Sequence, residues 1–201
     1  KESKLEPKVE IIPSKINKDK FEKGETAEVV YTIKTNKKEE IKKLQVNNAI
    51  QNVYSLGNDK YQITVSLDDK AGLKEIILQK VIFSDETEFE VSHEDSVEVL
   101  KQAPKVENFI LEEGNSKVDF KFNINDLDKS FKSGKIVLTS KDGDKQEKDF
   151  NKTDNLEFSF DVKDGMTYTV EVFLTYARDE ESTDIVDNEK SFDNTFTFNL
   201  D

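Results

Sequence analysis

The sequence predicts an all-β chain made of two tandem antiparallel β-sandwiches. Apolar and polar residues alternate with a period of two in segment after segment, whereas helical spacing never continues beyond about two turns. The 14 Phe and 5 Tyr, against a single Met, indicate a core of aromatic and β-branched residues, which strands favour. A length of 201 residues suits two domains of about 100 residues each.

In the first half, the expected strands are alternating or apolar runs separated by turn-rich pieces. Such pieces include "EKGE", "LGNDK" and "DDKAG", the last of which is also compatible with a short helical turn. The expected strands cover residues 9–12, 26–35, 41–46, 61–67, 74–83, 88–91 and 97–100.

The second half shows the same pattern of short strands at the spacing of a sandwich. Its expected strands cover residues 106–111, 118–125, 135–140, 145–150, 156–162, 167–176 and 195–200. In "KDGDK", Asp142 and Gly143 supply a tight hairpin turn. The acidic stretch 177–194 has no clear alternation, so we expect a solvated loop there.

The boundary between the two domains falls at "LKQAP". We expect one module at 1–101, a second at 106–201 and a short linker at 102–105. Pro104 removes a backbone donor and stiffens this linker. Two modules joined by so few residues should therefore act as a semi-rigid rod segment.

Charge and cysteine content exclude several classes of function. The net charge of −13 repels nucleic acid and anionic lipid surfaces. The absence of Cys excludes a disulfide scaffold, cysteine-ligated zinc and a thiol nucleophile. No apolar run approaches the roughly 20 residues of a membrane span, so we expect no membrane insertion. Because the chain opens on Lys1 rather than Met, we expect it to be a segment of a longer protein whose targeting signals and anchor lie elsewhere.

The stretch "LEFSFDVKDGMTYTVEV" resembles the fibronectin type III signature, in which a Gly-containing turn precedes a Tyr that opens the next strand. In sandwiches of this kind, such a Tyr fills the corner between the fifth and sixth strands while its hydroxyl bonds nearby backbone. Val162 ends the first strand, Gly165 forms the turn and Tyr168 is the corner residue. The chain has Asp164 where the family usually has Pro. We therefore expect Tyr168 to be a structural residue.

A wider resemblance covers nearly the whole chain. The phrases "KAG", "VEVLK" and "NDLDKSFKSGKI", with the apolar spacing around them, resemble immunoglobulin-like and fibronectin-like repeat modules of Gram-positive surface proteins. These include the non-catalytic regions of immunoglobulin A protease-type zinc metallopeptidases. The chain departs from the pattern at "VNNAI" and "FSDET", where longer hairpins are expected in place of Asn-Gly turns.

The catalytic role of such peptidases cannot be carried over. Zincin chemistry needs two His four residues apart on a helix with a Glu between them, and this chain has only His93, in "SHED". We expect His93 to lie in a solvated loop, although a metal ligand or general base is the alternative. We therefore predict no catalytic residue, no cofactor and no enzyme activity.

Acidic clusters are the main candidates for an ion. Calcium prefers several hard oxygens from one loop, and the candidates are Asp142, Asp144, Asp179 and Asp184, with Glu147, Asp126, Asp128, Glu180 and Glu181 nearby in sequence. None has the ordered spacing of a dedicated calcium loop, so turn formation and solubility are the alternative. A glycosidase-type carboxylate pair or a spontaneous Lys–Asn amide bond are further alternatives that spacing alone does not locate.

The resemblance implies a non-catalytic spacer and adhesion or interaction module of a larger extracellular, cell-surface protein. Its partners would be the flanking domains of the same protein and a host protein or glycan. One alternative is a dedicated binding module that recognises such a partner through the acidic 177–194 loop. Another is an ancillary domain that helps a neighbouring peptidase grip its substrate.

Overall fold

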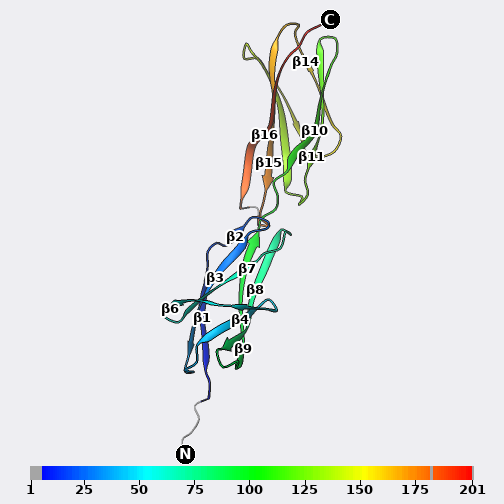
Figure 1. Ribbon diagram of the computed structural model, residues 1–201. Coiled ribbons are helices and arrows are strands. Elements are labelled where there is room, and N and C mark those ends of the chain that lie inside the picture. The colour runs from blue at the N-terminus through cyan, green and yellow to red at the C-terminus, as the bar shows by residue number, and fades with distance from the viewer. Residues whose placement is uncertain (1–5, 182, 201) are drawn as a thin grey trace, which may run out of the picture. The chain divides into compact units, whose positions relative to one another are not determined.

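The computed structural model describes residues 6–181 and 183–200, which form sixteen strands and no helix (Figure 1). The strands assemble into four sheets, in which every pairing but one is antiparallel. The chain divides into two compact units, Lys1–Leu100 and Lys101–Asp201. The predicted all-β sandwich fold is thus confirmed.

The first unit is a sandwich of a four-stranded and a five-stranded sheet. One sheet has the order β1-β3-β7-β6, formed by Val9–Ile16, Thr26–Thr35, Lys60–Ser66 and Tyr54–Gly57. The other has the order β2-β9-β8-β4-β5, formed by Lys20–Phe21, Glu88–Val99, Gly72–Phe83, Ile41–Val46 and Ala49–Asn52. Apart from the added edge strands β2 and β5, this is the strand order of the immunoglobulin fold.

Alternation along the strands builds the core of the first unit. In β3, Ala27, Val29, Tyr31 and Ile33 point inward and are fully buried, because side chains two apart share one face of a strand. Aliphatic residues from β4, β7, β8 and β9 pack against them from both sheets.

The second unit packs a three-stranded sheet on a four-stranded one. The smaller sheet has the order β10-β11-β14, formed by Lys105–Glu113, Lys117–Asn125 and Leu156–Asp161. The larger has the order β13-β12-β15-β16, formed by Lys145–Phe150, Phe131–Ser140, Thr167–Ala177 and Ile185–Thr197.

Aromatic rings dominate the core of the second unit. Phe120 lies between Phe109 at a centroid distance of 5.5 Å and Phe160 at 5.8 Å, and Phe122 contacts the ring of Phe150 edge-on at 5.6 Å. Offset and edge-on pairs of this kind add stability beyond the apolar area that they bury. Most of the Phe residues in the sequence therefore lie in this unit.

Three sequence expectations about individual elements are wrong. Residues 88–99 form one continuous strand, β9, rather than two strands around a loop, because polar residues at its inward positions hide the alternation. Residues 185–194 belong to β16 rather than to a long loop, because this edge strand exposes most of its side chains and contains register shifts. The "VNNAI" hairpin is not longer: Asn47 and Asn48, both at positive φ, make a two-residue turn.

The expected linker, residues 102–105, and the preceding Lys101 make contacts within the second unit. The N–H of Lys101 donates to the carbonyl of Arg178 at 2.9 Å, and that of Gln102 donates to a carboxylate oxygen of Asp128 at 2.6 Å. Pro104 is buried, immediately before β10 begins.

Candidate functional site

Tyr168 occupies the corner between the two sheets of the second unit. The chain crosses there from β14 to β15, and only 5% of Tyr168 is exposed. Its hydroxyl accepts a hydrogen bond of 2.8 Å from the backbone N–H of Lys163. The ring stacks on Phe196 of β16 at a centroid distance of 5.8 Å. The residue thus closes the sandwich and holds the preceding turn.

The turn before Tyr168 is also tied to the end of the chain. Gly165 adopts φ 76°, a conformation that favours glycine, and its N–H donates to the carbonyl of Phe198 at 2.8 Å. A carboxylate oxygen of Asp164 accepts a hydrogen bond of 2.8 Å from the N–H of Leu200. Asp164 therefore anchors residues that follow β16, which a proline at this position could not do.

The structure does not bring the four calcium candidates together. Asp142 and Asp144 follow β12 near the end where Ser140 pairs with Tyr168, and both are exposed. Asp179 and Asp184 lie beyond Tyr176, at the opposite end of β15. Eight residues of strand separate these ends by about 25 Å. Within residues 6–181 and 183–200, no three His, Asp or Glu side chains are grouped closely enough to hold a metal ion.

Asp179 has a structural role that sequence reasoning missed. It is 4% exposed, and one carboxylate oxygen accepts a hydrogen bond of 2.8 Å from the N–H of Thr183. The other accepts from the Thr183 hydroxyl at 2.5 Å. Asp179 therefore shapes the short β15–β16 connection, as Asp side chains often do in turns.

His93 lies on β9, not in a solvated loop, and faces Tyr31 of β3. Their rings meet edge-on at a centroid distance of 5.9 Å. The Nε2 atom of His93 and the hydroxyl of Tyr31 are buried, and neither has a hydrogen-bond partner among the described residues. Burial, followed by the charge of Asp95, raises the pKa of Tyr31 above its ordinary value.

This cluster lacks the arrangement of a nucleophile and its base. The Ser14 hydroxyl donates to a carboxylate oxygen of Asp95, and the same oxygen lies 3.4 Å from Nε2 of His93. The serine is thus bonded to the carboxylate rather than to the imidazole, whereas activation of a hydroxyl requires the imidazole as its partner. Its evident role is to connect β1 to β9.

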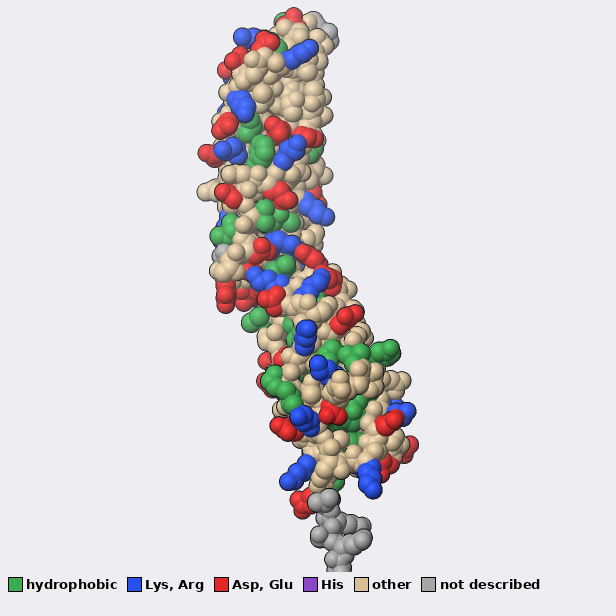
Figure 2. Space-filling view, turned by 90° about the vertical axis from the view of Figure 1, so that its left-hand side faces the viewer, with side chains coloured by type: hydrophobic (Ala, Val, Ile, Leu, Met, Phe, Trp, Pro, Cys, Tyr) green, Lys and Arg blue, Asp and Glu red, His purple; other side chains and the backbone are tan. Residues whose placement is uncertain are grey.

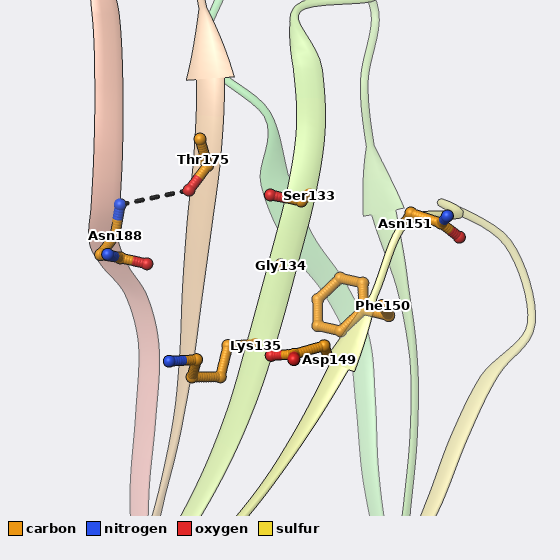
Figure 3. A pocket seen from close by; sticks show the side chains of 8 residues that line it. All are labelled: Ser133, Gly134, Lys135, Asp149, Phe150, Asn151, Thr175 and Asn188. Atoms are coloured by element: carbon orange, nitrogen blue, oxygen red, sulfur yellow. Dashed lines mark hydrogen bonds between the residues drawn. The ribbon is translucent and has the colours of Figure 1, made fainter.

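A polar hollow of about 510 Å³ lies on the larger sheet of the second unit (Figure 3). The N–H of Asn188 donates to the Thr175 hydroxyl at 3.3 Å, and that hydroxyl donates to Asp187 at 2.8 Å. Its lining consists of Ser133, Gly134, Lys135, Asp149, Phe150, Asn151, Thr175 and Asn188.

The aromatic ring of this hollow is not available to a sugar. In Figure 3 the Phe150 ring lies against Gly134, and a Cβ at position 134 would fall 2.2–2.8 Å from three of its atoms. Because Gly134 has no side chain, the ring of Phe150 can occupy the space above it, and Phe150 is only 8% exposed. Ligand sites are usually lined mainly by apolar groups, so this open polar surface is a weak candidate.

The sheet edges of the first unit provide a stronger candidate. Eight strands form the edges of the four sheets in the described part of the chain, namely β1, β6, β2, β5, β10, β14, β13 and β16. Each carries at least one charged residue except β5 and β6. Charged side chains are a common means of keeping edge strands from pairing with other chains. The two edges formed by β5 in one sheet and by β6 in the other lack this protection.

Large apolar side chains are exposed on both of these edge strands. Ile50 of β5 is 54% exposed, and in β6 Tyr54 is 69% and Leu56 45% exposed. Hydrophobic side chains also reach the surface elsewhere on both units, among acidic and basic ones (Figure 2). What distinguishes β5 and β6 is the absence of charge within the strands. Sequence reasoning missed both strands, although the uncharged run 44–58 was a visible signal.

Comparison with known proteins does not assign the chain to a family. The sequence matches no protein-family model and no curated protein. Among the described residues, no helix has the length and apolar character needed to cross a membrane.

Proposed function

We propose that this chain is a non-catalytic structural and interaction segment of a larger bacterial cell-surface protein. The observation that carries the proposal is that two sandwiches follow one another in the chain, each with its own hydrophobic core. The first has the strand order of the immunoglobulin fold, and the second carries a tyrosine corner. Both features agree with the resemblance to repeat modules of surface proteins.

The placement of the polar residues supports a role without catalysis. The candidate carboxylates Asp142 and Asp184 lie at opposite ends of one sheet, and Asp179 shapes a turn. Ser14 bonds Asp95 rather than His93. These groups are thus occupied in turns and strand contacts.

A binding role is favoured by one specific observation, the absence of charge from the edge strands β5 and β6. Recognition through the acidic stretch 177–194 would use an edge strand rather than a long loop, because residues 185–194 belong to β16. Exposed strand edges recognise partners through main-chain hydrogen bonds, and pockets for alternate side chains add specificity. The interaction function is therefore assigned to the first unit.

The mechanical part of the proposal is tested by pulling single molecules of the chain between its ends. A spacer built from two sandwiches should give two separate unfolding events. Each should lengthen the chain by about 30 nm, because an extended chain spans about 3.5 Å per residue. Val172→Asp, which places a charge in the core of the second unit, should remove one event and keep the other. A single event of about twice that length would contradict the proposal.

The location is tested by antibodies raised against residues 6–200. They should label intact cells of the bacterium that encodes the chain. Labelling that appears only after the cells are lysed would overturn the surface assignment.

A further inference from the structure

We propose that the free edge of β6, Tyr54–Gly57, binds an extended peptide strand of a partner protein. The partner strand is uncharged at its centre and carries a carboxylate at each end. This inference rests on the interaction role proposed above and names the partner's chemistry. Its evidence comes from the sequence, from the exposed edge and from the charges at the two ends of β6.

The sequence around β6 differs sharply from the rest of the chain. Charged residues make up 36% of the protein, yet the fifteen residues 44–58 contain none. This run covers the end of β4, all of β5 and all of β6. A surface segment that is kept free of charge in so charged a protein needs a physical reason.

The structure places this run where another strand can add. β6 pairs with β7 on one side only, through Tyr54 with Gln62 and Ser55 with Tyr61, and it forms the edge of its sheet (Figure 1). All four of its residues are exposed. An added strand would lie about 4.8 Å away and would cover the Tyr54 and Leu56 side chains on the edge. Burial of these apolar groups supplies the driving force.

Lysines stand at both ends of β6. The N–H of Val53, just before the strand, donates to the carbonyl of Lys42 at 3.0 Å, and Gly57 at its other end pairs with Lys60. Both lysines are exposed. Segment 42–60 contains three Lys and one Asp, a net charge of +2 in a chain of −13. At physiological salt the Debye length is about 8 Å, so the charges nearest the edge, namely these lysines with Asp59 and Glu40 close to Tyr61 of β7, outweigh the more distant carboxylates.

The same lysines disfavour a second copy of this chain as the occupant. Antiparallel pairing of β6 with β6 about a two-fold axis sets the Gly57 end of one copy against the Tyr54 end of the other. Lys60 of one copy then approaches Lys42 of the other, and like charges repel. A partner strand with a carboxylate at each end meets both lysines favourably. The charge arrangement therefore favours an acid-flanked partner over self-association.

The test is a titration of the full chain with two synthetic peptides whose ends are blocked, EVTITVE and KVTITVK, followed by ¹⁵N–¹H NMR. The acid-flanked peptide should shift the amide signals of residues 54–57 and bind about tenfold more tightly than the lysine-flanked one. Equal affinities, shifts confined to other edges, or no shifts with either peptide at millimolar concentration would overturn the proposal.

Two sets of variants test the role of the edge and of its lysines. Leu56→Lys places a charge on the edge and should abolish the shifts. Its matched control, Ile110→Lys, changes an exposed apolar residue on the charged edge strand β10 and should leave binding unchanged. The double variant Lys42→Glu, Lys60→Glu should reverse the preference between the two peptides. Unchanged preference would refute the role of the lysines.

Self-association supplies an independent readout. The single variant Lys60→Glu converts the repulsion between copies into attraction, so sedimentation should detect dimers that the unaltered chain does not form. A dimeric unaltered chain would show that a second copy, not a partner peptide, occupies the edge. None of these outcomes alters the two unfolding events expected of a spacer, so the two proposals fail separately.

Discussion

At the scale of single residues, Tyr168 shows what local sequence can specify. Its place after a Gly-containing turn and at the start of an alternating run predicts a corner, because the turn and the Tyr that make up the motif lie within a few residues of each other. The hydrogen bond from Lys163 spans five residues. The contact between Tyr31 and His93 joins strands that are far apart in sequence, so no local pattern predicts it.

Replacement of Tyr168 by Phe should lower the free energy of unfolding of the second unit by about 1 kcal/mol, the usual net value of one hydrogen bond. The ring and its packing on Phe196 are retained, so the loss reports the bond to the Lys163 N–H alone. Urea unfolding of the variant measures the change. Tyr54→Phe is the control, since Tyr54 is exposed and should tolerate the loss of its hydroxyl. Equal effects of both changes would contradict the corner role.

At the scale of strands, prediction succeeds where one face is buried and fails at the edges. The central strand β15 is expected at 167–176 and observed at Thr167–Ala177, because each inward side chain is apolar. The edge strands β5, β6 and β16 expose most of their side chains. Burial therefore imposes no alternating pattern on their sequences. These segments form strands because they pair with neighbouring strands. Since the candidate binding edge is made of such strands, it too escaped sequence-based prediction.

The hairpin between β8 and β9 should lose a stabilising contact in acid. Asp85 accepts hydrogen bonds from Nζ of Lys37 at 2.7 Å and from the N–H of Thr87 at 3.0 Å. The Lys37 bond above all, and then Thr87, lower the pKa of Asp85 to about 2. Because the ordinary Asp value is about 3.9, the folded state holds the ionised form more strongly than the unfolded state. The contribution of ionised Asp85 to stability is therefore complete above the ordinary Asp pKa of about 3.9 and disappears as the pH falls towards the folded-state pKa of about 2.

Asp85→Asn should therefore lower the melting temperature at about neutral pH. The difference in melting temperature from the unaltered chain should vanish in acid, as the pH approaches the pKa of Asp85 in the folded state. Differential scanning calorimetry across this range measures the effect. Asp69→Asn, at an exposed carboxylate between β7 and β8, serves as the control and should show no such dependence. A difference that persists in strong acid would contradict the assigned ion pair.

At the scale of the whole molecule, the two cores differ in chemistry. The first is mainly aliphatic, and the second contains most of the phenylalanine rings. The two clusters share no residue. Composition predicts an aromatic and β-branched core, and the positions of the Phe residues along the sequence already place most of them in the second unit. Which rings contact one another cannot be predicted in this way, because that depends on how strands far apart in sequence face one another. Because the cores are separate, loss of packing in one core should not destabilise the other.

Each unit should unfold as its own cooperative transition. Leu44→Ala in the first core and Phe120→Ala in the second each remove a fully buried side chain, which costs about 2–5 kcal/mol. For a domain of this size, such a loss lowers the melting temperature by about 10 °C or more. In calorimetry of the full chain, each substitution should shift one transition and leave the other in place. If either substitution shifted both transitions equally, the units would unfold as one body, and a spacer made of independent modules would no longer describe this chain.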